Sequence, residues 1–266
     1  MSITLERVIV IKIGGSTFDS QDTTFEDIVY LQRRGEMLVV VHGGANRVTE
    51  WLAKQGLSTR FINGERVTDK AALDMVTAVL GGLVNKEIVA SINSLGGQAV
   101  GICGIDGALI QGRIREKDMG YVGEVAKINL ALLEVLLGSG FVPVISPLCL
   151  HSFGRQEGAP LSLNINGDVL AGELAAALGA ERLIFLTDVA GILDQSGKLQ
   201  PQLSPEEAKA LITSGVASKG MVVKIKACLR ALSTISTARI IDGRQPHALL
   251  REIEGANEGT TIGIPK

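Results

Sequence analysis

Five short apolar runs, rich in β-branched residues, recur along the chain, and only Lys12 adds a charge to any of them. They occupy residues 8–13, 38–41, 99–102, 141–145 and 183–186. Uninterrupted apolar runs of this length are typical of strands buried on both faces of a parallel sheet. The pattern therefore predicts an α/β sandwich and argues against a half-exposed antiparallel sheet.

Segments with helical spacing or helix-capping signals lie between and after these runs. They occupy residues 25–34, 46–55, 69–95, 130–138, 168–178 and 205–214. Strands and helices thus alternate over most of the chain, which is typical of a parallel sheet whose two faces are covered by helices.

The segment at 69–95 carries a wider apolar stripe than a surface helix usually needs. The stripe comprises Leu73, Met75, Val76, Val79, Leu80, Leu83 and Val84. Two interpretations fit this width: the helix packs against a second subunit, or it is a central helix covered on all sides by its own domain.

The composition fits a chain with a substantial core. Its 266 residues are 46% hydrophobic, enough for one large α/β domain or for two lobes with a boundary near residues 178–180. The net charge of -2 provides no general basic surface, which argues against nucleic acid or anionic lipid as a partner. Any anionic ligand must be bound by local groups.

No targeting signal stands out. The N-terminal apolar run is too short for a signal peptide, and no later run reaches membrane-spanning length. Cys103, Cys149 and Cys228 lie among apolar neighbours without CxxC spacing, which predicts reduced, buried thiols and no metal site. We expect a cytoplasmic protein.

Paired glycines follow the first two predicted strands, as Gly14 and Gly15 and as Gly43 and Gly44. Glycine lets the backbone approach a ligand closely, and the start of a following helix favours phosphate or carboxylate. Each pair by itself is more often a plain tight turn. The sequence matches neither the P-loop pattern nor the dinucleotide-binding pattern, so both of those folds are disfavoured.

Three charged residues stand out, each with a plain structural alternative. Lys12 ends an apolar strand, where an ammonium group is costly unless it faces an anion or reaches solvent at the strand edge. Lys224 could be a surface lysine on a helix. Asp168 precedes an alanine-rich helix, so helix capping would explain it.

Seven segments taken together, in order, resemble the amino acid kinase superfamily and within it the acetylglutamate kinases. They are KIGGS at 12–16, HGGAN at 42–46, RVTD at 66–69, VNK at 84–86, NINGD at 164–168, LTDVAGIL at 186–193 and GMVVK at 220–224. The RVTD and VNK segments and the NIN-x-D pattern are more specific to this family than the glycine pairs are.

The resemblance implies a three-layer αβα sandwich with a mainly parallel central sheet. Residues 1–178 would form the acyl-amino-acid-binding and dimerisation lobe, and residues 179–266 the ATP-binding lobe. It also implies a homodimer. Because only about seven residues precede the first predicted strand, the extra N-terminal helix of arginine-inhibited hexameric members is not expected, and neither is strong inhibition by arginine.

By resemblance, Lys12 and Lys224 contact the phosphoryl group in transfer, and Asp168 orients both lysines. The residues implied for binding the acylated substrate are Gly43, Gly44, Arg66 and Asn164. Those implied for binding the nucleotide are Gly14, Gly15, Asp188, Val189, Ala190, Gly191, Ile192, Leu193, Val216, Ala217 and Ser218.

The implied reaction moves the γ-phosphoryl group of ATP to the γ-carboxylate of N-acetyl-L-glutamate, giving N-acetyl-glutamyl 5-phosphate and ADP in arginine biosynthesis. A carboxylate is already ionised at pH 7, so no general base is needed. We expect Mg²⁺ to be carried in by the nucleotide instead of being caged by protein carboxylates.

Two departures leave a second substrate open. Ala45 stands where the family usually has glycine, and Gly167 where it usually has alanine. A sister branch that phosphorylates a carrier-bound aminoadipate or glutamate often shows such changes. The short segment between Gly56 and Arg66 and the slightly acidic chain favour N-acetylglutamate, since an acidic carrier prefers a basic rim.

Members that phosphorylate uridylate, carbamate, aspartate or free glutamate are disfavoured by the RVTD context. The alternative from a different functional class of protein is a non-catalytic nucleotide sensor that keeps the fold. The presence of Lys12, Lys224 and Asp168 argues against that sensor.

Overall fold

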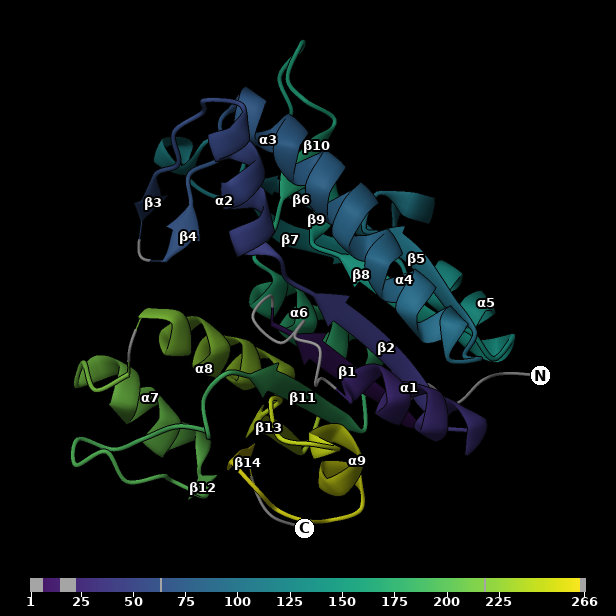
Figure 1. Cartoon of the computed structure of the whole chain (residues 1–266). Helices are drawn as coiled ribbons and strands as arrows, with labels where there is room; N and C mark the ends of the chain where they lie inside the picture. The colour runs from purple at the N-terminus through teal and green to yellow at the C-terminus, as the bar shows by residue number, and fades with distance from the viewer. Residues whose placement is uncertain (1–6, 15–22, 63, 218, 264–266) are drawn as a thin grey trace.

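Eight strands form one mainly parallel sheet through the middle of the molecule (Figure 1) in the computed structural model, which describes residues 7–14, 23–62, 64–217 and 219–263. The strand order is β12-β14-β13-β11-β1-β2-β8-β5, and only the β13–β14 pair is antiparallel. The strands are β1 Val8–Ile13, β2 Met37–His42, β5 Ala99–Cys103, β8 Val142–Ser146, β11 Arg182–Thr187, β12 Gln202–Leu203, β13 Thr237–Asp242 and β14 Thr260–Gly263. The five predicted strands are confirmed within one or two residues.

Alternation along β1 shows how the sheet builds two cores. Val8 and Val10 belong to one hydrophobic cluster, whereas Ile9, Ile11 and Ile13 belong to the other. Successive side chains of a strand point to opposite faces, so a strand that is apolar throughout requires cover on both sides. Lys12 shares the face of Val8 and Val10.

Helices supply that cover, and the three-layer prediction is confirmed (Figure 1). One face carries α5 Ala131–Gly138, α6 Gly167–Leu178, α7 Pro205–Thr213 and α8 Lys219–Ala231. The other carries α1 Thr24–Arg33, α2 Ala45–Lys54, α9 Ala248–Ile253 and the long helix Lys70–Ser94.

The long helix is interrupted in its middle. It consists of α3 Lys70–Val76, the π-helical turns η2 Thr77–Val84, and α4 Asn85–Ser94. The wider π-helical turns change which residues of the predicted apolar stripe face the core. Val84 is buried, whereas Leu83 is only half-buried. The helix starts at Asp69, whose carboxylate accepts a hydrogen bond from Ala72 N at 2.8 Å.

By length and composition alone, the helix Lys70–Ser94 would be able to cross a membrane. Its carboxyl half packs on β5 and β8, which makes it part of a layer of the sandwich. None of its large apolar side chains is exposed, although Met75, Leu83 and Val89 are only half-buried.

A second, four-stranded sheet and a short hairpin were not predicted. The sheet has the order β10-β9-β6-β7, and the hairpin joins β3 to β4. Their bounds are β3 Phe61–Ile62, β4 Glu65–Arg66, β6 Ile110–Ile114, β7 Gly123–Ile128, β9 Leu148–His151 and β10 Ser162–Asn164, with short 3₁₀ turns η3 Asp106–Ala108 and η4 Lys117–Met119 nearby. Both units lie beyond the end of β2 in Figure 1.

The three cysteines are free thiols, as predicted. Cys149 and Cys228 are buried, but Cys103 is only half-buried, so the prediction of burial is wrong for that residue. Burial raises the pKa of Cys149 to about 12, and it raises that of Cys228 as well. Neither thiol is a reactive thiolate at neutral pH.

Helices α6 and α8 approach each other closely at Gly172. A Cβ atom on Gly172 would lie only 2.5 Å from the backbone oxygen of Ala227. Glycine is therefore needed at this contact, which brings the start of α6 near the middle of α8.

Candidate active site

Three charged side chains from distant parts of the sequence meet at the carboxyl end of β1. Lys12 Nζ lies 2.7 Å from Asp168 Oδ1, and Lys224 Nζ lies 2.9 Å from Asp168 Oδ2. Lys12 comes from β1, Asp168 from the first turn of α6 and Lys224 from α8. The structure thus brings together the three residues that the sequence analysis assigned to catalysis.

The environment of this cluster is mostly dry. The side chains of Lys12 and Asp168 are each 9% exposed, and that of Lys224 is 21% exposed. Burial by itself would raise the pKa of Asp168, but the charges and hydrogen bonds of the two lysines outweigh it, so the pKa lies below its ordinary value. Asp168 is therefore a carboxylate at neutral pH.

Helix capping does not explain Asp168. The cap of α6 is Asn166, whose side-chain oxygen accepts hydrogen bonds from Asp168 N at 2.8 Å and Val169 N at 3.4 Å. The carboxylate of Asp168 is consequently free to bind the lysines.

Gly14, Gly43 and Gly44 stand where strands end, as predicted. Gly14 N donates to Leu186 O at 3.3 Å, and Gly43 N donates to Ile13 O at 3.0 Å. Gly44 has a φ of 139°, and a Cβ atom there would lie 2.7 Å from Leu80 Cδ2. Only glycine fits this position without strain. Gly15 lies outside the described residues.

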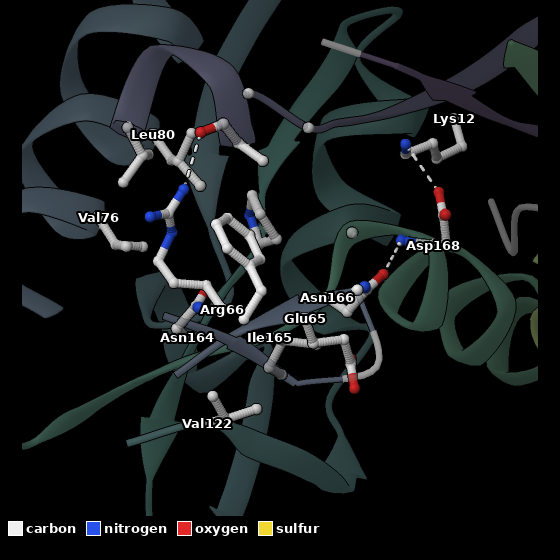
Figure 2. Close-up of a pocket in the computed structure, with 18 residues that line it drawn as sticks. Lys12, Glu65, Arg66, Val76, Leu80, Val122, Asn164, Ile165, Asn166 and Asp168 are labelled. Atoms are coloured by element: carbon white, nitrogen blue, oxygen red, sulfur yellow. Dashed lines mark hydrogen bonds and ion pairs between the residues drawn. The ribbon is translucent and has the colours of Figure 1, made fainter. Parts of the chain in front are cut away.

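A cavity of about 220 Å³ opens beside the cluster. All four residues predicted to bind the acylated substrate line it, together with Lys12 and Asp168. Figure 2 shows Lys12 and Asp168 on one side of this cavity and Arg66 on the opposite side.

Half of the Arg66 guanidinium group is held by the protein. Its Nη2 donates to Ala45 O at 2.9 Å and to Thr49 Oγ1 at 2.8 Å, and the group lies 4.8 Å from the Phe61 ring centre. Its Nη1 is buried and has no hydrogen-bond partner within the described parts of the chain. Burial lowers the pKa of Arg66, yet arginine stays charged. A carboxylate in the cavity would satisfy this donor.

Thr68 is a site residue that the sequence analysis missed. It is fully buried, and its Oγ1 accepts a hydrogen bond at 3.0 Å from the side chain of Asn164, which lines the cavity. The RVTD segment thus has three roles: Arg66 faces the cavity, Thr68 orients Asn164, and Asp69 caps the long helix. The motif was the available signal, but it did not reveal the contact with Asn164.

A second cavity, of about 260 Å³, shares Lys12 and Ala45 with the first. Its lining includes Gly14, Asp188 and Lys224 as well as Lys12. Lys12 thus lines both cavities, whereas Lys224 lines the second one and reaches the first through its ion pair with Asp168. The arrangement suits transfer of an anionic group from a ligand in one cavity to a ligand in the other.

The other described residues that were predicted to bind the nucleotide line neither cavity. Val189, Ala190, Gly191, Ile192 and Leu193 continue the loop after Asp188, with Ile192 buried and Leu193 exposed.

The other predicted nucleotide segment lies between α7 and α8. Val216 and Ala217 are half-buried there, and Ala217 N donates to Leu211 O at 3.2 Å. Ser218 falls outside the described residues.

A metal cage formed by the protein is not among the described groups. No cluster of three His, Cys, Asp or Glu side chains that could hold a metal ion occurs in residues 7–14, 23–62, 64–217 and 219–263.

Comparison with protein families matches residues 7–242 to the amino acid kinase family. Among curated proteins, acetylglutamate kinase from Dehalococcoides mccartyi is 49% identical over 98% of this chain and 96% of its own length. Acetylglutamate kinase from Nostoc sp. is 47% identical over 93% of this chain and 84% of its own.

Solved structures share the fold. N-acetylglutamate synthase from Neisseria gonorrhoeae, in complex with coenzyme A and N-acetyl-glutamate, superposes with a TM-score of 0.82 at 26% identity. The match covers 97% of this chain and 60% of the synthase. Carbamate kinase from Giardia lamblia, bound to AMP-PNP, gives a TM-score of 0.66 at 16% identity over 99% of this chain and 100% of its own, which supports the fold alone.

Asp168→Asn should destabilise the protein in a pH-dependent way. At pH 7 the two ammonium groups lose their shared counter-ion, so we expect the free energy of unfolding to fall by about 3 kcal/mol. Because the folded-state pKa of Asp168 lies below its ordinary 3.8, the stabilisation is present above 3.8 and is lost as the pH falls below it. Urea denaturation at pH 7 and pH 3 should therefore show a smaller difference between the two proteins at pH 3. An equal difference at both values would contradict this role.

Proposed function

Because this chain belongs to the amino acid kinase family and, within it, to the acetylglutamate kinases, we propose that it transfers the γ-phosphoryl group of ATP to the γ-carboxylate of N-acetyl-L-glutamate. The products are N-acetyl-glutamyl 5-phosphate and ADP, in arginine biosynthesis. The observation that carries the proposal is the pair of lysines around Asp168, with Lys12 lining two cavities, one of which is also lined by Arg66.

The acylated amino acid is proposed to occupy the cavity with Arg66. Its α-carboxylate would accept from the free Nη1 of Arg66, and Asn164 would contact the same end of the substrate. Its γ-carboxylate would then lie toward Lys12 and the glycine pair Gly43 and Gly44. The opposite placement of Lys12 and Arg66 in Figure 2 supports this orientation.

ATP is proposed to occupy the cavity lined by Gly14, Asp188 and Lys224. The loop 189–193 and residues 216–218 would follow its adenosine part, as the resemblance implies. Residues 1–178 would then be the acyl-amino-acid and dimerisation lobe and residues 179–266 the ATP lobe, in a cytoplasmic enzyme.

Catalysis in this proposal depends on alignment and charge. A γ-carboxylate oxygen forms a bond to the γ-phosphorus as the bond from that phosphorus to the β,γ-bridging oxygen breaks, and ADP leaves with the electron pair. No proton has to be removed. The ammonium groups of Lys12 and Lys224 stabilise the charge that develops on the phosphoryl oxygens, while Asp168 holds them in place.

Mg²⁺ would enter on the phosphate oxygens of ATP, since the described residues offer no carboxylate cluster for it. It would neutralise part of the phosphate charge when bound.

The direct test is a coupled assay of ADP release with N-acetyl-L-glutamate. We expect turnover with this substrate and much slower turnover with N-acetyl-aminoadipate or with a carrier-bound substrate. Faster turnover with either of the last two would replace the proposed substrate. If none of the three supported ADP release, the chain would be a nucleotide-binding protein and not this kinase.

A homodimer is proposed in which the long helix Lys70–Ser94 packs against a second copy of the chain. A second copy would complete the burial of Met75, Leu83 and Val89, the half-buried large apolar side chains of this helix. Light scattering should give about twice the chain mass of 28.0 kDa. A monomeric mass at micromolar concentration would contradict the proposal.

Lys12→Ala and Lys224→Ala should each lower kcat about a hundredfold and change KM far less, because each lysine acts on charge that develops during transfer. Steady-state kinetics with both substrates will measure the effect. Lys226→Ala is the matched control, since Lys226 is an exposed lysine of the same helix. Near-normal turnover in either variant would remove that lysine from the mechanism.

Arg66→Lys should mainly raise the KM for N-acetyl-L-glutamate, by about tenfold. The planar guanidinium group can donate to Thr49 and to a carboxylate at once, whereas the ammonium group of lysine lacks this geometry. The KM for ATP should stay unchanged. Arg60→Lys, at an exposed position of the same segment, serves as the control. An unaltered KM for the acylated amino acid would contradict the assignment.

A further inference from the structure

His42 ends β2 directly before the glycine pair, and no role has yet been given to its side chain. The residue is completely buried, so its ring cannot reach a ligand in the cavity. Its two ring nitrogens both have partners: Nε2 lies 3.2 Å from Asn85 Nδ2, and Nδ1 lies 2.8 Å from Gly43 O.

Asn85 belongs to the VNK segment, at the point where the π-helical turns give way to α4. Its Nδ2 also donates to Val144 O at 2.9 Å, and its Oδ1 accepts from Lys86 Nζ at 3.0 Å. If the Asn85 amide were flipped, its oxygen would face the Val144 carbonyl oxygen and its nitrogen would face the ammonium group of Lys86. These two contacts therefore fix which end of the amide faces His42.

The orientation of Asn85 selects one tautomer of His42. An amide nitrogen only donates, so Nε2 must be the accepting nitrogen and the ring proton must be on Nδ1. From there it donates to Gly43 O. Burial lowers the pKa of His42 to about 4, and the charges of Lys12 and Lys86 act in the same direction, which agrees with a neutral ring at pH 7.

The bond to Gly43 O orients the next peptide group. In a planar trans peptide the carbonyl and the following N–H point in opposite directions. With the Gly43 carbonyl held by the ring, the Gly44 N–H points away from the ring. Gly44 lines the substrate cavity, and within the part of the chain that the structure describes its N–H has no hydrogen-bond acceptor.

We propose that His42, held in a single tautomer by Asn85, is a positioning residue that aims the Gly44 N–H at the acceptor carboxylate of the substrate. The assignment of that carboxylate rests on the proposed function. The position of the peptide group does not, because it is set by contacts within the chain. His42 is no general base, since its accepting nitrogen is already occupied by Asn85.

The tautomer can be measured without any substrate. In ¹⁵N-labelled protein at pH 7, one ring nitrogen of His42 should show the shift of a protonated nitrogen and the other that of an unprotonated one, with the proton on Nδ1. The chain has only 3 histidines, so the signals can be assigned by comparison with His42→Asn. A proton on Nε2, or on both nitrogens, would overturn the proposal.

Kinetics test the consequence for the reaction. His42→Leu removes the ring donor, and we expect kcat with N-acetyl-L-glutamate to fall at least about tenfold, as for a displaced backbone donor, with an unchanged KM for ATP. His42→Asn puts an amide N–H near the place of Nδ1 and should recover most of that loss. Recovery by asparagine separates positioning from simple packing.

His151→Leu is the matched control. His151 is also a buried histidine whose Nδ1 contacts a backbone carbonyl, that of Pro160 at 3.0 Å, but it lines neither of the two cavities. It should leave kcat unchanged. Normal turnover in a folded His42→Leu variant, or equal losses in His42→Leu and His42→Asn, would overturn the proposal.

The two proposals can fail separately. Wild-type protein that does not phosphorylate N-acetyl-L-glutamate would refute the proposed function, while the tautomer measurement would still decide the inference on His42. If His42→Leu does not fold, that same measurement and the activity of His42→Asn decide it.

Discussion

One carboxylate holds together two ammonium groups that would otherwise repel each other. Asp168 lies within 2.9 Å of both Lys12 and Lys224, and all three come from different elements of the chain. Burying Lys12 in the sheet would be costly without this counter-ion. The cluster still carries one net positive charge, since two cations share one anion, and that surplus suits a ligand rich in phosphate.

The parallel sheet explains why the site lies where it does. Parallel strands end at the same edge, so the ends of β1 and β2 lie side by side, with Lys12 paired with Val41 and Ile13 with His42. The second sheet and the β3–β4 hairpin add Asn164 and Arg66 from beyond that edge. In the proposed reaction, the sheet would supply groups for the transfer, and the added units would supply groups for recognising one substrate.

The sequence predicted the central strands and most helices because their patterns are local. It missed β13, where Arg239 looks like a surface residue but is buried against Glu252, with Nη2 donating to Oε2 at 2.8 Å. The convergence of Lys12, Asp168 and Lys224 came from resemblance to a family, since no spacing rule joins residues so far apart. Tertiary hydrogen bonds such as that of Thr68 leave no periodic signal, so they required the structure.

The close contact of α6 and α8 at Gly172 has a mechanical consequence. No side chain separates the two backbones there, so nothing at that point can compress or rearrange to let one helix slide over the other. The contact therefore resists sliding of α6 along α8. Asp168 lies about one helical turn from Gly172, so a fixed contact there helps to hold its carboxylate beside Lys224 of α8.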